Sequence, residues 1–218
     1  MLGAWQEWML DTPDGMWSAC NVLAGSPPPT NVIGSWIGSQ DELNRYLDRF
    51  AAKVAPTGRT VLPMDYGAAM RFFAGCLPAC QPDDGSPFVA SSRMLHRPVD
   101  PARIVGLLEG RRTGRAQFDT FGGAIARVRP DATAFPHRHA IASSQAYVDV
   151  VGVSVAEARR IMADLRDGIG HDTGYVNYID PDMPDWPTAY YGRNLPRLRR
   201  VARRYDPDRV LAFPQGLA

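Results

Sequence analysis

The chain has 218 residues, of which 24 are Lys or Arg and 23 are Asp or Glu, so its net charge at pH 7 is +1. Such a balanced charge gives no long-range field that would attract nucleic acid or an anionic membrane surface. Hydrophobic residues make up 45% of the sequence, which argues against a disordered chain, and no apolar run is long enough to span a bilayer. We therefore expect a folded globular protein that binds neither nucleic acid nor membranes.

The N-terminus and the cysteines favour a cytoplasmic protein. Residues 1–8 lack a basic stretch followed by an uninterrupted apolar core, so they do not read as a secretory signal. Three cysteines are too few for a disulfide framework or a four-cysteine zinc site. Cys76 and Cys80 flank a proline-containing turn and could be bridged, but buried free thiols are the simpler interpretation.

The first part of the chain mixes strand and helix patterns without a repeat. Apolar or β-branched runs between turn residues predict strands, and a capping box formed by Ser39 and Glu42 predicts the start of a helix. The elements predicted there are strands at residues 17–24, 31–37 and 60–64, a helix after Ser39 and a second helix at residues 68–74.

The same patterns continue through the middle of the chain. Asp100 followed by Pro101, and Ser154 with Glu157, mark the starts of two further helices. The predicted strands are residues 88–95, 117–121, 124–128 and 141–151. Because strands outnumber helices and do not alternate strictly with them, we predict an α+β fold, with a mainly antiparallel multi-stranded sheet and helices packed on one face.

A C-terminal helical segment follows a glycine- and aspartate-rich stretch at residues 168–174. We divide the chain there into residues 1–170 and residues 171–218. Asp185 and Asn194 are expected to cap two helices of the second part. The apolar residues expected on the inner face of the last helix are Leu195, Leu198, Val201 and Tyr205.

Two groups of basic residues need a separate interpretation. The last helix carries five arginines, but they lie mainly opposite its apolar stripe and no RNA-binding signature accompanies them, so a solvated helix face is favoured over nucleic-acid binding. His137 and His139 would share one face of a strand, and His171 could join them as metal ligands. A third convergent ligand is not evident, so we predict no metal site.

The most specific feature of the sequence is a spaced series of aromatic, amide and turn residues near the C-terminus. Its members are Tyr175, Asn177, Tyr178, Asp180, Tyr190, Tyr191, Gly192, Tyr205, Asp206, Pro207, Pro214 and Gln215. This series resembles the C-terminal segment of the berberine bridge enzyme-like family of FAD-linked oxidases. Residues 121–123, 134–138 and Gln145, together with Ser91 and Ser92, are similar to the family's substrate-domain strands, so the likeness covers most of the chain.

The resemblance implies half of a flavoenzyme. Residues 1–170 would be the substrate-binding domain and residues 171–218 the C-terminal segment, whereas the chain has no counterpart of the family's flavin-binding loop and no dinucleotide-binding glycine motif of its own. The chain would act as part of an FAD-dependent oxidase of a hydroxyl- or amine-bearing small molecule, with a separate FAD-binding domain or polypeptide. The isolated chain would then be inactive. A truncated non-catalytic remnant or a small-molecule-binding module is the alternative.

The resemblance also implies roles for four residues. Tyr175 corresponds to an aromatic residue that acts as a base or positions the substrate beside the flavin, and Tyr178 corresponds to its neighbour. Gln145 takes a substrate-facing strand position, and Asn177 lies close to the isoalloxazine with Tyr175. A tyrosine needs a cationic or hydrogen-bonding neighbour that lowers its pKa before it can act as a base. Without the resemblance, Tyr175 and Tyr178 would be interpreted as ordinary half-buried aromatic residues.

Overall fold

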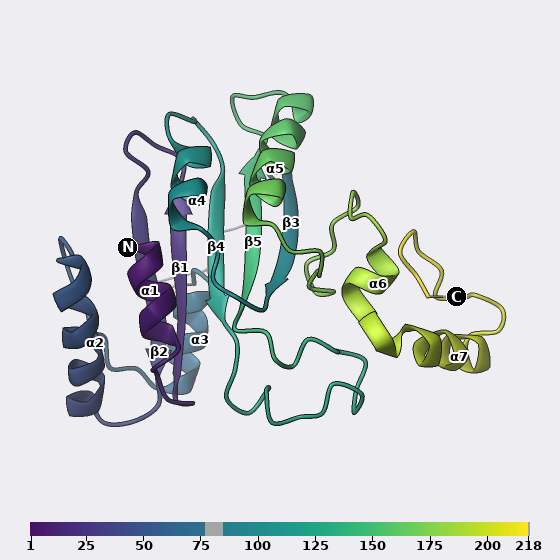
Figure 1. The fold of residues 1–218 in the computed structure, drawn as a ribbon, viewed down its shortest axis with the longest axis horizontal. Coiled ribbons are helices and arrows are strands. Elements are labelled where there is room, and N and C mark those ends of the chain that lie inside the picture. Colours follow the sequence, from purple (N-terminus) through teal and green to yellow (C-terminus); the bar gives the residue numbers. More distant parts are fainter. Residues whose placement is uncertain (77–84, 218) are drawn as a thin grey trace.

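The structure is a computed structural model that describes residues 1–76 and 85–217, with a five-stranded sheet at its centre (Figure 1). The strands are β1 (Met16–Leu23), β2 (Thr30–Trp36), β3 (Phe88–Leu95), β4 (Arg115–Thr120) and β5 (Ala142–Asp149). They lie in the order β2-β1-β4-β5-β3, and every neighbouring pair is antiparallel. The predicted α+β class with an antiparallel sheet is confirmed.

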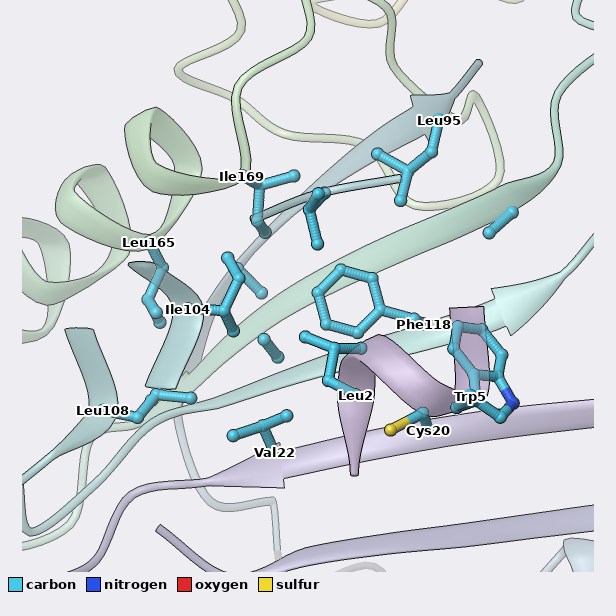
Figure 2. Packing of buried hydrophobic residues seen from close by; sticks show 14 of the residues in the cluster. Leu2, Trp5, Cys20, Val22, Leu95, Ile104, Leu108, Phe118, Leu165 and Ile169 are labelled. Carbon is cyan, nitrogen blue, oxygen red and sulfur yellow. The ribbon is translucent and has the colours of Figure 1, made fainter. Parts of the chain in front are cut away.

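Four helices cover one face of the sheet and enclose the main hydrophobic core (Figures 1 and 2). They are α1 (Leu2–Met9), α2 (Gln40–Val54), α4 (Pro101–Leu108) and α5 (Val155–Ile169). The capping box of Ser39 and the caps by Asp100 and Ser154 form as predicted. The helices pack against alternate strand residues, so one side of the sheet is buried and mainly apolar, with buried polar residues such as Ser91 and Arg93 on β3. Core residues from helices and strands include Leu2, Trp5, Cys20, Val22, Ile104, Leu108, Phe118 and Leu165.

The opposite side of the sheet is polar across β4, β5 and β3. Helix α3 (Tyr66–Phe73) contacts this side at β1, where the rings of Trp17 and Phe73 lie 5.3 Å apart. Beyond that contact, the alternate residues of the three strands form what we call the polar face. The polar face consists of Arg115, Gln117, Asp119, Ser143, Gln145, Tyr147, Ala90 and Ser92, and the buried apolar Met94 lies opposite Ser143 on the same side. This face is where the strands present groups capable of chemistry.

The C-terminal segment, residues 171–217, lies beside the edge strand β3 (Figure 1). It contains α6 (Trp186–Tyr191), the 3-10 turn Gly192–Asn194 and α7 (Leu195–Tyr205). Thr173 joins it to β3, because its hydroxyl donates to the carbonyl of Met94 at 2.8 Å and its own carbonyl accepts from the Met94 amide at 3.0 Å. A small cluster of Met183, Ala189 and Tyr190 forms its interior.

Several predicted details of the C-terminal segment are wrong. Asp185 and Asn194 occupy the N-cap positions of α6 and α7 without making a side-chain cap hydrogen bond. The amide of Asn194 instead donates to the carbonyls of Pro130 and Thr133, at 2.7 and 3.0 Å, because it is needed to hold the loop before β5. Helix α7 buries none of its residues, and its predicted inner-face residues Val201 and Tyr205 are exposed.

Two predicted strands do not form, and one helix was not predicted. Residues 60–64 and 124–128 are irregular, since Pro63 cannot donate to a sheet and Gly122 and Gly123 turn the chain away from β4 with positive φ angles. Helix α1 has no side-chain N-cap to mark its start. Within residues 1–76 and 85–217, no helix combines the length and the apolar character needed to cross a bilayer.

Cys20 is a buried free thiol, and its burial raises the pKa of the thiol to about 12. The choice between a Cys76–Cys80 bridge and free thiols depends on residue 80, which lies outside the described residues.

Candidate functional site

Residues 175–180 bring the C-terminal segment to the edge of the polar face. Ser92 anchors this stretch: its hydroxyl accepts from the Tyr175 amide at 3.0 Å and lies 3.2 and 2.9 Å from the carbonyl oxygens of Tyr175 and Tyr178. Ser92 is the cross-strand partner of Gln145, which in turn pairs with Gln117 on β4. The predicted residues on β5 and in the C-terminal segment therefore lie together, although at least 30 positions separate them in the sequence.

Tyr175 stands in an aromatic cluster. Its ring meets those of Phe121, Phe135 and Tyr178 edge-on, with centroids 5.6, 5.9 and 5.1 Å away. Its hydroxyl accepts a hydrogen bond of 2.9 Å from the exposed amide of Asn177. These contacts fix the ring of Tyr175 while leaving the Asn177–Tyr175 pair at the surface.

Gln145 connects Tyr178 to a carboxylate that sequence reasoning missed. Its side chain is near enough to Tyr178 and Asp119 to lower the pKa of both groups. Asp119 also accepts from the amide of Gln117, at 3.0 and 3.3 Å to its two oxygens, and is only 9% exposed. The polar face thus holds a linked group of one tyrosine, one carboxylate and two amides.

The two titratable residues of this group, Asp119 and Tyr178, differ in their protonation state at neutral pH. Burial raises the pKa of Asp119 above its ordinary value, and the hydrogen bonds from Gln117 and Gln145 oppose the change only in part. Burial also raises the pKa of Tyr178, and the nearby Asp119 and Tyr175 add to the effect, while Gln145 opposes it. Tyr178 therefore remains a protonated hydrogen-bond donor at neutral pH, and Asp119 is a carboxylate of increased basicity.

A tyrosine that acts as a base is expected to have a neighbour that lowers its pKa. The neighbour that should lower the tyrosine pKa is present as Gln145, but the pKa of Tyr178 is raised overall because burial and Asp119 outweigh it. The roles of Tyr175, Tyr178, Gln145 and Asn177 stay predictions. A sequence signal for Asp119 existed in the alternation of β4, where Arg115, Gln117 and Asp119 are polar and the residues between them are apolar.

A cavity of about 880 Å³ adjoins the polar face at the far end of β5. Its lining includes Tyr147, whose ring stacks on Phe88 at 4.5 Å and lies 4.2 Å beneath the guanidinium of Arg115. Arg112 and Asp149 supply charged groups to the same lining. Since Tyr147 is two residues from Gln145 on the same face, the cavity continues the surface that carries Asp119 and Tyr178.

The histidines considered as metal ligands do not converge. His137 is buried, and its Nε2 lies 3.0 Å from the carbonyl oxygen of Ala189 in α6, so the ring is occupied by a structural hydrogen bond. His139 is exposed. In the part of the chain that the structure describes, no group of three or more His, Cys, Asp or Glu side chains could hold a metal ion.

The exposed groups beside Tyr175 have the chemistry to contact a planar polar ring, and the prediction that this ring is a flavin stays a prediction. Asn177 and Tyr178 are exposed at the edge of the polar face, beside the aromatic ring of Tyr175, and offer an amide and a hydroxyl to a planar polar ring. The sequence provides no glycine-rich phosphate loop. Any FAD bound here would therefore be held mainly by other protein groups.

Comparison with known proteins agrees with this fold. Residues 174–218 match the family model described as "Berberine and berberine like". The chain is 29% identical to the uncharacterized FAD-linked oxidoreductase YgaK of Bacillus subtilis, over 98% of this chain and 48% of that protein. It is 26% identical to the xylooligosaccharide oxidase of Thermothelomyces thermophilus, over 99% of this chain and 48% of that protein.

The fold is shared with a solved structure. Berberine bridge enzyme from Eschscholzia californica superposes with a TM-score of 0.83 at 19% identity, over 99% of this chain and 51% of that chain. The chain spans about half the length of the relatives it matches. The resemblance to berberine bridge enzyme-like FAD-linked oxidases is thereby confirmed, whereas the division at residue 170 stays a prediction.

Proposed function

We propose that this chain provides the substrate-binding and C-terminal part of an FAD-dependent oxidoreductase that oxidises a hydroxyl- or amine-bearing small molecule. The observation that carries the proposal is the convergence of Asp119 and Gln145, on the sheet, with Tyr175, Asn177 and Tyr178, which lie in the segment that matches the family model. The relatives that include a xylooligosaccharide oxidase support a substrate with hydroxyl groups. A separate FAD-binding domain or polypeptide would complete the site.

The chemistry of the polar face suits the removal of a hydroxyl proton. Tyr178 donates a hydrogen bond that orients the substrate oxygen, and Asp119 accepts the proton as the carbonyl product forms. Burial favours this division of roles, because it raises the pKa of Asp119 and that of Tyr178. Gln145 lies between Asp119 and Tyr178 and interacts with both side chains. When bound, FAD supplies the acceptor for the hydride that leaves the substrate carbon.

The aromatic residues on this side of the molecule support contact with a further protein unit. Phe73, Phe88 and Tyr178 are 38, 53 and 42% exposed. A partner that covers this side of the molecule would bury these apolar rings, which favours association. A flavin-binding unit that covers the polar face would remove these side chains from water and exclude solvent from Asp119.

The direct test is complementation. The purified chain is mixed with a candidate FAD-binding polypeptide, and complex formation, flavin absorbance and hydrogen peroxide production are recorded with a panel of oligosaccharides, alcohols and amines. We expect a yellow complex and substrate-dependent peroxide only in the mixture. Asp119→Asn and Tyr178→Phe should retain the yellow complex and lose turnover. A colourless, non-associating mixture with every candidate would contradict the proposal.

The cavity beside Tyr147 favours a second function, in which the chain is a small-molecule-binding module or a non-catalytic remnant. This function requires no flavin. Calorimetric titration of the isolated chain with the same compounds distinguishes the two. Binding that is abolished by Tyr147→Ala and unaffected by Asp119→Asn, without any flavin complex, would support the module.

A further inference from the structure

The C-terminal segment contacts both faces of the edge strand β3. Successive residues of a strand point to opposite faces. On the polar face, Ser92 holds Tyr175 and Tyr178. On the helix-covered face, Ser91 and Arg93 reach Asp180, only two residues beyond Tyr178. Residues 175–180 therefore wrap around β3 and are fixed from both sides.

Asp180 is the centre of the contacts on the helix-covered face. Its carboxylate accepts from the Ser91 hydroxyl at 2.6 Å and from the Asp182 amide at 2.8 Å, and lies 3.9 Å from Nη1 of Arg93. The exposed fractions of the Arg93 and Asp180 side chains are 6 and 4%. A buried charge without its partner is strongly unfavourable, so each of the two residues requires the other to remain in place.

The backbone of Asp180 is held as firmly as its carboxylate. Its amide donates to the Tyr190 hydroxyl at 2.8 Å, and its carbonyl accepts from the Gln215 amide at 2.8 Å. Arg93 is fixed in turn by the Ser92 carbonyl, 2.6 Å from Nη1. The position of Asp180 is thus determined by β3, by α6 and by the end of the chain together.

We propose that the buried Arg93–Asp180 pair is a positioning device that fixes Tyr178 over Gln145 and Asp119. The catalytic importance of the Tyr178 position rests on the proposed function, but the position of Tyr178 can be measured in this chain alone. Ser92 contacts only backbone atoms of Tyr175 and Tyr178. The position of residues 179 and 180 therefore depends on the contacts of Asp180, where the Arg93 ion pair acts together with the hydrogen bonds to Ser91, Tyr190 and Gln215.

The test uses the full chain without flavin or substrate, so its result does not depend on the complementation experiment. Asp180→Asn and Arg93→Met are compared with the wild type by hydrogen exchange and by carbon-13 tyrosine NMR, with the Tyr178 resonance assigned through Tyr178→Phe. We expect the amides of Tyr175 and Asp180 to exchange about tenfold faster, while β4 and β5 keep their protection. The Tyr178 hydroxyl should titrate at a lower pH, because it leaves Asp119 and becomes hydrated.

Three further variants, one test and two controls, allow a result even if Asp180→Asn and Arg93→Met unfold. Ser91→Ala removes the 2.6 Å hydrogen bond to Asp180 without leaving a charge unpaired, so it reports on the same device if the other variants unfold. Arg111→Met and Asp164→Asn break a partly exposed ion pair of 2.7 Å between the turn after α4 and helix α5, and serve as matched controls. The inference is overturned if folded Asp180→Asn, Arg93→Met or Ser91→Ala retains the wild-type exchange at residues 175–180 and the wild-type titration of Tyr178. This test does not require a flavin complex, so a failed complementation experiment would not affect its result.

Discussion

The two faces of the central sheet differ in composition although the same strands form both. On the helix-covered face, Cys20, Val22, Phe118 and Val148 are fully buried in the main core. On the polar face, the intervening residues include Gln117, Asp119 and Gln145, joined by hydrogen bonds. Alternation along each strand therefore separates the residues that stabilise the fold from those that can carry out chemistry.

This separation means that substitutions on the two faces should have different consequences. Changes on the covered face should alter the free energy of unfolding, because they create cavities among α1, α4 and α5. Changes on the polar face should alter activity and ligand binding with small effects on stability. The substitutions below compare residues of opposite faces.

The largest effect on stability is expected from Phe118→Ala. Phe118 lies on β4 and is fully buried in the core. Its truncation should lower the free energy of unfolding by about 3–5 kcal/mol, as expected for a large core side chain. Gln117→Ala, on the adjacent residue and the other face, should cost about 1 kcal/mol or less. Urea denaturation followed by circular dichroism measures both, and equal losses would contradict the division between the faces.

The fold was largely predictable because most of its elements carry local signals. The capping residues Ser39 and Ser154 and the alternating pattern of residues 88–95 each specify an element without reference to the rest of the chain. Residues 60–64 and 124–128 carry a similar apolar pattern but have no neighbouring strand to pair with. A short apolar run alone therefore does not predict a strand.

The candidate site was predictable only in part. The C-terminal series led to Tyr175, Asn177 and Tyr178, and the resemblance led to Gln145. Asp119 was missed because its significance depends on the pairing of β4 with β5 and on residues 175–180 folding back over them. Such contacts join residues far apart in the sequence, and no local pattern specifies them.

The next largest effect is expected from Asp119→Asn. In the reconstituted enzyme it should lower turnover by about 10²-fold or more, because a general base is lost. The same substitution should raise the stability of the fold at neutral pH, although it lowers turnover. The folded-state pKa of Asp119 is raised, so the stability that this residue contributes at acid pH is lost as the pH rises through its folded pKa.

The amide variant avoids that loss and should unfold at a higher temperature than the wild type at pH 7. Calorimetry at pH 7 checks the sign, and a lower unfolding temperature for Asp119→Asn would show that the carboxylate stabilises the fold. Asp14→Asn serves as the exposed carboxylate control.

A smaller, pH-dependent effect is expected where the polar face meets the C-terminal segment. Burial lowers the pKa of His137, and the nearby His96 adds to the change, while the bond to the Ala189 carbonyl opposes it. The neutral ring is thus favoured in the folded state. Stability from His137 is present above the unfolded pKa near 6.5 and is lost as the pH falls toward the folded pKa.

The free energy of unfolding should decrease between pH 8 and pH 5. The decrease should be about 1.4 kcal/mol for each unit by which the folded pKa of His137 is lowered. His137→Gln should reduce the pH dependence. The exposed His139→Gln is the matched control and should retain it. Identical pH profiles for the two variants would exclude His137 as the source.

The smallest effect is expected from Arg115→Gln, three residues before Phe118 on β4. Arg115 is exposed on the polar face, and its guanidinium lies 4.2 Å from the ring of Tyr147. An exposed contact of this kind contributes about 0.5–1 kcal/mol, so the free energy of unfolding should decrease by no more than that. Because Tyr147 lines the cavity, the same variant should weaken any ligand whose binding Tyr147→Ala abolishes. A loss of stability comparable to that of Phe118→Ala would mean that the polar face also supports the fold, and that β4 does not divide stability from function.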